Sequence, residues 1–118
     1  MQELRQGEVW LVHFHEGWER PSIVVSRNQL NRGELILVVP CTSSEVARRR
    51  VFPNQVFLPQ GEAGLATDSV AQTHLVQPAH VSWFMQRLGA LAPEDLGEVL
   101  RSIAWVIDFF DTAEPPPA

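Results

Sequence analysis

Side chains that bind metals or perform catalysis are few in this sequence, and most of them stand alone. His13 and His15 are two residues apart, so on a strand both rings face the same side, and Glu16 follows them. These residues are candidates for a metal site, but no second set of ligands accompanies them, and a polar strand face is the simpler interpretation. The sequence has no phosphate-binding glycine loop, dinucleotide fingerprint or nucleophile elbow. We therefore predict chemistry that uses neither a metal nor a cofactor.

Arginine is the only strongly basic residue type, since all nine lysine or arginine positions are arginines. Its planar fork of donors matches phosphate oxygens in pairs, although a coding bias towards arginine explains the composition more simply. The formal net charge of −5 argues against a surface that attracts nucleic acid as a whole. The composition leaves open a local, arginine-lined groove on an acidic body.

Chain length and cysteine content restrict the fold and the compartment. The 118 residues are expected to form one domain over 1–111, followed by a flexible, proline-rich tail over 112–118. Cys41 is the only cysteine and lies in an apolar stretch, which indicates a buried, inert thiol in a reducing compartment. The N-terminus lacks an apolar signal core, and no apolar run is long enough to span a membrane. We therefore expect a cytoplasmic protein without a membrane partner.

The first two-thirds of the chain has the pattern of short strands separated by turns. Residues 7–15 alternate, which places Val9 on one face of a strand and Trp10 and Val12 on the other. Residues 34–43 are almost continuously apolar and predict a strand buried on both faces. Further strands are predicted at 23–25, 55–58 and 69–76.

Three local features complete the predicted architecture. Pro40 is expected to end a ladder or to mark a bulge. Residues 44–50 lack alternation and predict a mobile basic loop. From Pro93 the apolar positions recur with a helical period, which predicts a helix of about 18 residues on the open side of a small barrel or sandwich.

Six segments carry a resemblance to a known family, and they occur in that family's order. They are GEVWLV at 7–12, RPSIVVSRNQLN at 20–31, LVVPCTS at 37–43, DSVA at 68–71, RLGALAPEDL at 87–96, and the terminal helix. Together they resemble the MazF/PemK family of toxin endoribonucleases. Members of that family have a G-(D/E)-(I/V)-W strand, an Arg-Pro before a V-V-V-S strand, a V-P-(C/V/L)-T-(S/T) strand end and an I-G-x-L-x-x-E-x-L entry to a final helix. The resemblance extends over residues 6–110; each motif is weak alone, and the set together is fairly specific.

The resemblance implies a mainly β fold with a C-terminal α-helix, an SH3-like small barrel of the plasmid-maintenance toxin type that forms a homodimer. It implies metal-independent cleavage of single-stranded RNA at short sequences, with neutralisation by a cognate, MazE-like antitoxin. The family's catalytic pair, the Arg of Arg-Pro and the Thr of the V-P-x-T strand end, corresponds to Arg20 and Thr42. In that family the ribose 2′-hydroxyl attacks the neighbouring phosphate, which leaves a cyclic phosphate and a free 5′-hydroxyl.

The side chains around this pair suit the implied reaction. The guanidinium of Arg20 can stabilise the charge that grows on the phosphate. The hydroxyls of Thr42 and Ser43 can hydrogen-bond the phosphate or the 2′-hydroxyl. None of these groups is a good base, so a proton acceptor is still needed. The candidates lie in or beside the turn before the arginine: Glu16, Glu19 and His15.

Aromatic and basic residues elsewhere are expected to contact RNA or the antitoxin. Trp18 can stack on a base, or it can join Trp83 in an apolar surface for a flexible antitoxin tail. A run of three arginines has two interpretations, an RNA contact and a solvated loop: Arg48, Arg49 and Arg50.

One stretch departs from the family pattern, and other functions stay open. After the S-V-A strand the family usually carries a Gln-(I/V)-(R/K)-(S/T) stretch that lines the RNA groove. Here Gln72 and His74, or Leu75 and Gln77, occupy the Gln and basic positions, depending on the alignment. Both alignments lose the basic residue, which we expect to affect base specificity and RNA affinity. The alternatives are a same-fold toxin that acts on a protein target such as gyrase, and a non-catalytic SH3-like binding module.

Overall fold

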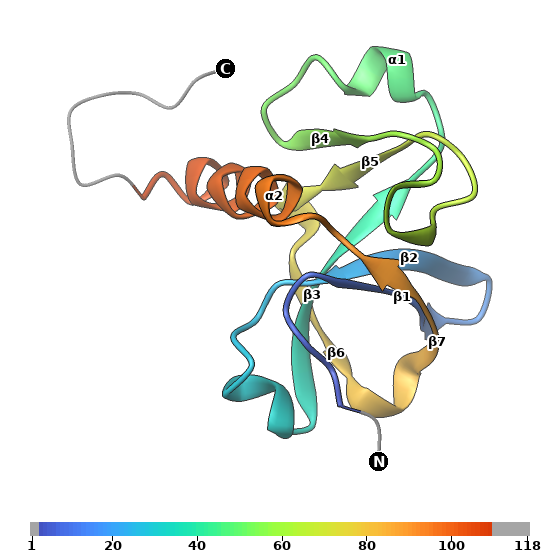
Figure 1. The fold of residues 1–118 in the computed structure, drawn as a ribbon, viewed down its shortest axis with the longest axis vertical. Helices are drawn as coiled ribbons and strands as arrows, with labels where there is room; N and C mark the ends of the chain where they lie inside the picture. Colours follow the sequence, from blue (N-terminus) through green and yellow to red (C-terminus); the bar gives the residue numbers. More distant parts are fainter. Residues whose placement is uncertain (1–2, 110–118) are drawn as a thin grey trace.

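The computed structural model describes residues 3–109, which form antiparallel strands and a C-terminal helix (Figure 1). The strands are β1 Glu8–His15, β2 Trp18–Val24, β3 Leu35–Thr42, β4 Gln55–Leu58, β5 Ser69–Gln72, β6 Gln77–His80 and β7 Phe84–Ala90. The α-helices are α1 Val46–Arg49 and α2 Pro93–Val106. Short 3-10 helices are η1 Leu30–Arg32, η2 Glu62–Gly64, η3 Thr73–Leu75 and η4 Val81–Trp83.

The strands form one sheet in the order β4-β5-β3-β2-β1-β7, and β6 also pairs with β3. On one edge β3 pairs with β2 through Val38, Val39 and Pro40. On its other edge β3 pairs first with β6, up to Val38, and then with β5, at Cys41 and Thr42. The sheet is not closed and is small and barrel-like. The predicted class, mainly β with a C-terminal helix, is confirmed.

Two apolar cores lie on opposite faces of the strands β1, β2 and β3. Val9, Ile23 and Val39 belong to the first core, which includes Val99 of α2. The alternate residues of the same strands belong to the second core: Trp10, Val12, Val24, Ile36 and Val38. The predicted alternation of β1 is therefore confirmed. The predicted burial of the 34–43 strand on both faces holds only for residues 38–41, because Leu35 and Leu37 are 62% and 42% exposed. Pro40 is the last β3 residue paired with β2, as expected for a residue that ends a ladder.

The prediction of one strand over 69–76 is wrong. The strand ends at Gln72, because the fully buried Thr73 turns away from the sheet. Its hydroxyl lies 2.6 Å from the hydroxyl of Ser102 on α2, and its N–H donates to the carbonyl of Asn54 at 3.1 Å. After this turn the chain forms β6 and then β7, two strands that sequence periodicity did not predict.

The prediction of a basic loop over 44–50 is also wrong in part, because Val46–Arg49 form the short helix α1. Glu45 precedes this helix with a left-handed φ of 52° and pairs with Arg48 at 2.9 Å. The helix α2 has 14 residues rather than about 18, and it is followed by Asp108 with a left-handed φ of 56°. Figure 1 shows α2, in orange, beside β4.

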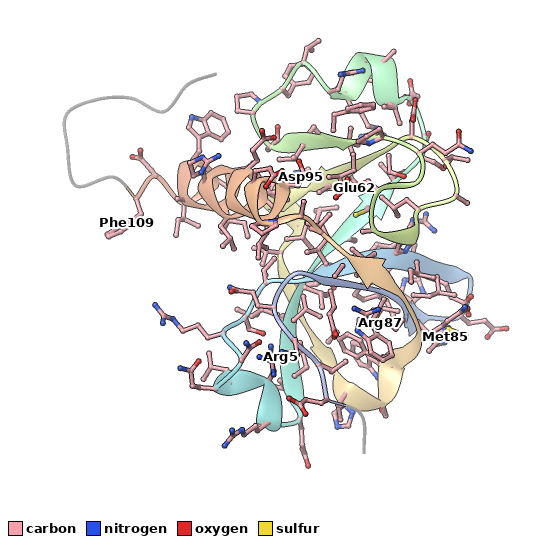
Figure 2. The ribbon with its side chains drawn as sticks, viewed as in Figure 1. Arg5, Glu62, Met85, Arg87, Asp95 and Phe109 are labelled. Carbon is pink, nitrogen blue, oxygen red and sulfur yellow. The ribbon has the colours of Figure 1, made fainter. Side chains whose placement is uncertain are left out.

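The N-terminus of α2 is held by Glu62 of η2. Its carboxylate accepts a hydrogen bond from the N–H of Ala92 at 3.3 Å. Partial burial and the neighbouring carboxyl of Asp95 raise the pKa of Glu62 (Figure 2). The expected domain end at residue 111 and the tail over 112–118 lie outside the described residues. Within 3–109, no helix has the length and apolarity needed to cross a membrane.

The carboxylate of Glu8 connects three segments of the chain. It accepts hydrogen bonds from the N–H of Arg5 at 3.0 Å and from Nε1 of Trp10 at 3.0 Å. Its second oxygen accepts from Nε of Arg87 on β7 at 3.1 Å, and Figure 2 shows Arg5 and Arg87 on the two segments concerned. Burial raises the pKa of Glu8, but these hydrogen bonds and the charge of Arg87 outweigh it, so the net pKa is lowered. The fold therefore favours the ionised carboxylate.

We predict that Glu8→Gln lowers the free energy of unfolding by about 1–3 kcal/mol near neutral pH, because the buried Trp10 and the donors of Arg5 and Arg87 lose a charged acceptor. The pKa of Glu8 is lower in the folded state, so its contribution is present above the unfolded pKa and is lost as the pH falls through the folded pKa. Urea denaturation at neutral and acidic pH measures both effects. As a control, Glu3→Gln removes an exposed partner of Arg5 and should change stability by less than about 0.5 kcal/mol. Equal losses in both variants would contradict the prediction.

Candidate active site

A pocket of about 380 Å³ lies where β2 begins and β3 ends. It brings together four of the residues that the sequence predicted for the site: Glu19, Arg20, Thr42 and Ser43. Its remaining lining residues are Pro21, Cys41, Ser44, Leu65, Ala66, Thr67 and Ser69. The pocket is therefore formed by the two strand ends and by the segment 65–69 that precedes and begins β5.

The register of β2 and β3 explains why Arg20 and Thr42 meet. Ser22 is the partner of Pro40 in an antiparallel ladder. Each step back along β2 corresponds to a step forward along β3, so Arg20 and Thr42 lie two residues beyond this last pair, at the same end of the two strands. At this point β3 has left β2 and pairs with β5 through Thr42. The opening between the two strand ends becomes the pocket.

The third wall of the pocket is held by a close approach of two backbones. Gly64, at the end of η2, has a φ of 78°, and a Cβ at this position would collide with the carbonyl of Leu88. A Cβ on Gly89 of β7 would meet Ala63 at 2.5 Å. Both positions therefore require glycine, which places the following Leu65 in the first core and the segment after it over the pocket. Gly89 is the glycine of the RLGALAPEDL segment.

The guanidinium of Arg20 is available to an anion. Its Nη1 donates to the backbone carbonyl of Glu19 at 2.9 Å, and its central carbon lies 5.8 Å from the ring centroid of Trp18. None of the ion pairs found among residues 3–109 includes this arginine. The backbone contact and the ring orient the side chain while its charge stays uncompensated.

The hydroxyl of Thr42 is oriented by the turn that follows β3. Its Oγ1 accepts a hydrogen bond from the N–H of Ser44 at 3.2 Å. A hydroxyl that accepts from the backbone keeps its own proton free to donate. Thr42 and Ser43 can therefore offer donors to a phosphate in the pocket.

Of the two carboxylates predicted as proton acceptors, the pocket contains only Glu19. Its Oε2 lies 3.0 Å from Nδ1 of His13, its partner across the β1–β2 hairpin. Glu16 lies in the hairpin turn and is exposed, and its carbonyl is 3.1 Å from Nδ1 of His15. From the sequence, His13 was a candidate only for metal binding. Its contact with Glu19 depends on the pairing of β1 with β2, which cannot be inferred from composition and spacing. In residues 3–109, no group of three or more His, Cys, Asp and Glu side chains is placed to hold a metal ion.

The three arginines of the predicted RNA contact lie outside the pocket lining and interact with nearby groups. Arg48 pairs with Glu45 at 2.9 Å, and Nε of Arg49 donates to the carbonyl of Ser44 at 3.1 Å. The guanidinium of Arg50 lies 3.6 Å from the ring centroid of Phe57. An RNA contact from these side chains requires them to exchange these partners.

The polar residues expected after the S-V-A strand also lie outside the pocket lining. Nδ1 of His74 is 2.8 Å from the amide nitrogen of Asn54. The amide of Gln77 donates to the carbonyl of Leu75 at 3.1 Å, and Gln72 ends β5. The structure thus separates these residues from the group formed by the two strand ends.

Comparisons with known proteins agree with this fold. The family model described as "PemK-like, MazF-like toxin of type II toxin-antitoxin system" matches residues 5–107. A solved structure of an endoribonuclease in complex with its cognate antitoxin, from Mycobacterial species, has a TM-score of 0.76 at 21% identity, covering 89% of this chain and 95% of that chain. The Mycobacterium tuberculosis toxin MazF-mt6 has a TM-score of 0.75 at 17% identity, with 87% and 98% covered. MazF from Deinococcus radiodurans has a TM-score of 0.72 at 22% identity, with 92% and 100% covered.

Cys41 adjoins the catalytic candidates without sharing their exposure. Its side chain is buried in the first core, and burial raises the pKa of the thiol to about 12. The thiol is therefore protonated and unreactive at neutral pH.

We predict that iodoacetamide does not modify Cys41 in the native protein near neutral pH, because the thiolate and access to it are both lacking. Mass spectrometry should find one adduct only after denaturation. Modification of the folded protein at the rate of the denatured chain would show that the thiol is open to the pocket.

Proposed function

The chain belongs to the PemK-like, MazF-like toxin family of type II toxin–antitoxin systems, and from this premise we propose that it is an endoribonuclease that cleaves single-stranded RNA at short sequences. The observation that carries the proposal is the pocket in which Glu19, Arg20, Thr42 and Ser43 meet. It supplies a cation for phosphate, hydroxyl donors and a carboxylate that accepts a proton. Solved structures with the same fold, at identities of 21% and 19%, are named endoribonucleases.

Cleavage begins when the ribose 2′-oxygen attacks the adjacent phosphorus. Glu19 accepts the proton of the 2′-hydroxyl, and His13 holds the carboxylate in place from the opposite strand. Arg20 and the hydroxyls of Thr42 and Ser43 bind the phosphate oxygens, whose negative charge increases in the transition state. The bond between phosphorus and the 5′-oxygen then breaks, and this oxygen takes up a proton. The products are a 2′,3′-cyclic phosphate and a free 5′-hydroxyl.

This reaction needs no metal ion in the scheme that we propose. The nucleophile is part of the substrate and is already next to the phosphorus, so the protein contributes orientation, a base and charge stabilisation. The side chains that line the pocket supply each of these contributions.

We further propose a cognate, MazE-like antitoxin and a homodimeric, cytoplasmic toxin. The similar solved structures include an endoribonuclease with its cognate antitoxin from Mycobacterial species and MazE-MazF complexes from Deinococcus radiodurans. An antitoxin that covers the pocket would neutralise the activity by excluding RNA. Contacts of RNA with the arginine run at 48–50, and with Gln72, His74 or Gln77, remain predictions.

We predict that Arg20→Ala and Thr42→Ala each lower the rate of RNA cleavage by at least ~100-fold, because each removes a group that stabilises the transition state. Cleavage of a single-stranded RNA in the presence of a chelator measures the rate, and circular dichroism confirms the fold. Arg101→Ala, at an exposed arginine of α2, is the matched control and should cleave at the wild-type rate. A well-folded Arg20→Ala protein with normal activity would refute the proposed site.

We predict that Glu19→Gln lowers kcat by about 100-fold or more and changes KM little, because the amide keeps the shape of the side chain but accepts no proton. The matched variant Glu16→Gln lies in the same hairpin and is expected to keep most of the activity, since Glu16 does not line the pocket. Single-turnover kinetics measure the two rates. The reverse order of effects would assign the base to the hairpin turn.

A further inference from the structure

A row of aromatic rings leads away from Arg20 along the surface. We call Trp18, Phe14 and Trp83 the aromatic strip. The ring centroids of Phe14 and Trp18 are 4.4 Å apart, and those of Phe14 and Trp83 are 6.4 Å apart. The guanidinium of Arg20 lies over Trp18 at 5.8 Å. The phosphate-binding cation of the proposed site and the aromatic strip are therefore continuous.

The strip is assembled from two elements that are distant in sequence. Trp18 starts β2 and is paired with His15, while an irregularity in the β1 ladder next to Phe14 places this ring beside Trp18. Trp83 ends η4, which leads into β7. Phe14 packs against the second core, but Trp83 has 37% of its surface exposed. Phe14 and Trp18 are half-buried, and His15 stacks on Trp18 at 5.5 Å, so Trp83 is the most exposed ring of the strip.

We propose that the aromatic strip is a base-stacking platform for the unpaired nucleotides on one side of the phosphate held by Arg20. The inference rests on the proposed function. Every base has a flat π-face, so stacking on aromatic side chains binds single-stranded nucleic acid with little dependence on sequence. The order cation, then rings, matches the order phosphate, then bases, along a strand that leaves the active site.

The charge of the chain is the second argument for RNA contact by stacking. The formal net charge is −5, and the arginines at 48 and 50 already interact with Glu45 and Phe57. The strip itself is flanked by histidines and carboxylates rather than by further arginines: His15, His80, Glu16 and Glu34. Affinity for RNA must then come mainly from contacts that are not ionic. Accordingly, the salt dependence of binding should be shallow, with a slope of about −0.7 for each phosphate contacted.

Trp83 is the residue that tests the proposal. Trp18 lies against Arg20, so its removal also disturbs the phosphate site. The aromatic neighbours of Trp83 are Phe14 and His80, and neither these residues nor Trp83 line the pocket. The test compares Trp83→Leu, which removes the stacking surface, with Trp83→Phe, which keeps a ring. Trp105→Leu is the matched control, because Trp105 on α2 has the same exposed fraction, 37%, and lies outside the strip.

The measurement is kcat and KM on a single-stranded RNA of about ten nucleotides around a mapped cleavage site. We expect Trp83→Leu to raise KM roughly 5- to 150-fold, the loss of one stacked base, with kcat unchanged. Trp83→Phe should retain most of the affinity, and Trp105→Leu should match the wild type. On a dinucleotide substrate, which does not reach the strip, Trp83→Leu and the wild type should be equal.

Two results would overturn the proposal while leaving the proposed function intact. One is an unchanged KM in Trp83→Leu on the ten-nucleotide RNA. The other is a Trp83→Leu protein that changes only its oligomeric state, which would make the strip a protein interface. If the wild type cleaves no RNA, the proposed function fails, and the binding of a fluorescently labelled single-stranded RNA of about ten nucleotides, measured by anisotropy, tests the strip separately. Weaker binding by Trp83→Leu than by Trp105→Leu would then support it, and equal binding would refute it.

Discussion

The second half of β3, residues 38–41, is buried on both faces, and β3 has paired neighbours on both edges; the arrangement of the molecule depends on this constraint. Buried peptide groups require partners, so this part of β3 must have hydrogen-bonding neighbours. On one edge β3 pairs with β2. On the other edge it pairs with β6 before Pro40 and with β5 after it, and Pro40 itself has no N–H to donate. Because β3 leaves β2 at the same place, an opening remains between the start of β2 and the end of β3. The pocket forms there, beside Thr42.

Local pattern predicted the elements whose burial is regular along the chain. The alternation of β1 and the apolar run of β3 are visible in the sequence because the polarity of each side chain reflects whether its face of the strand is buried. The strands β6 and β7 were missed because they depend on a tertiary event, the turn at Thr73 that is fixed by Ser102 of α2. A sequence window does not contain a contact between residues this far apart. The early end of α2 likewise follows from the left-handed Asp108, which periodicity does not signal.

The sequence predicted those site residues that lie within recognisable motifs. It did not predict the contacts that depend on how the strands pair. Arg20 and Thr42 lie within motifs of the family, and both follow the last β2–β3 pair, Ser22 with Pro40, at the end of the strands where the pocket lies. The choice of proton acceptor between Glu16 and Glu19 depends on where the hairpin turn ends and the β1–β2 ladder begins. Only Glu19 lies in the ladder, paired with His13, and lines the pocket. The sequence also did not predict the helix α1 or the ion pair between Arg48 and Glu45, which precedes that helix.

Some arginines of the chain interact with other side chains and Arg20 has no carboxylate partner among the described residues, and this difference bears on which of them can act in binding and which in catalysis. A groove lined with unpaired arginines would bind RNA strongly in its ground state and its transition state alike, which lowers KM without raising kcat. In this chain Arg48 and Arg50 interact with Glu45 and Phe57, whereas Arg20 has no carboxylate partner among the described residues. Under the proposed function, its charge acts where negative charge increases during the reaction. The acidic body weakens general attraction to RNA. Under the proposed function and the proposed stacking platform, electrostatic stabilisation would be concentrated on the cleaved phosphate, and the neighbouring nucleotides would be held mainly by contacts that do not depend on charge.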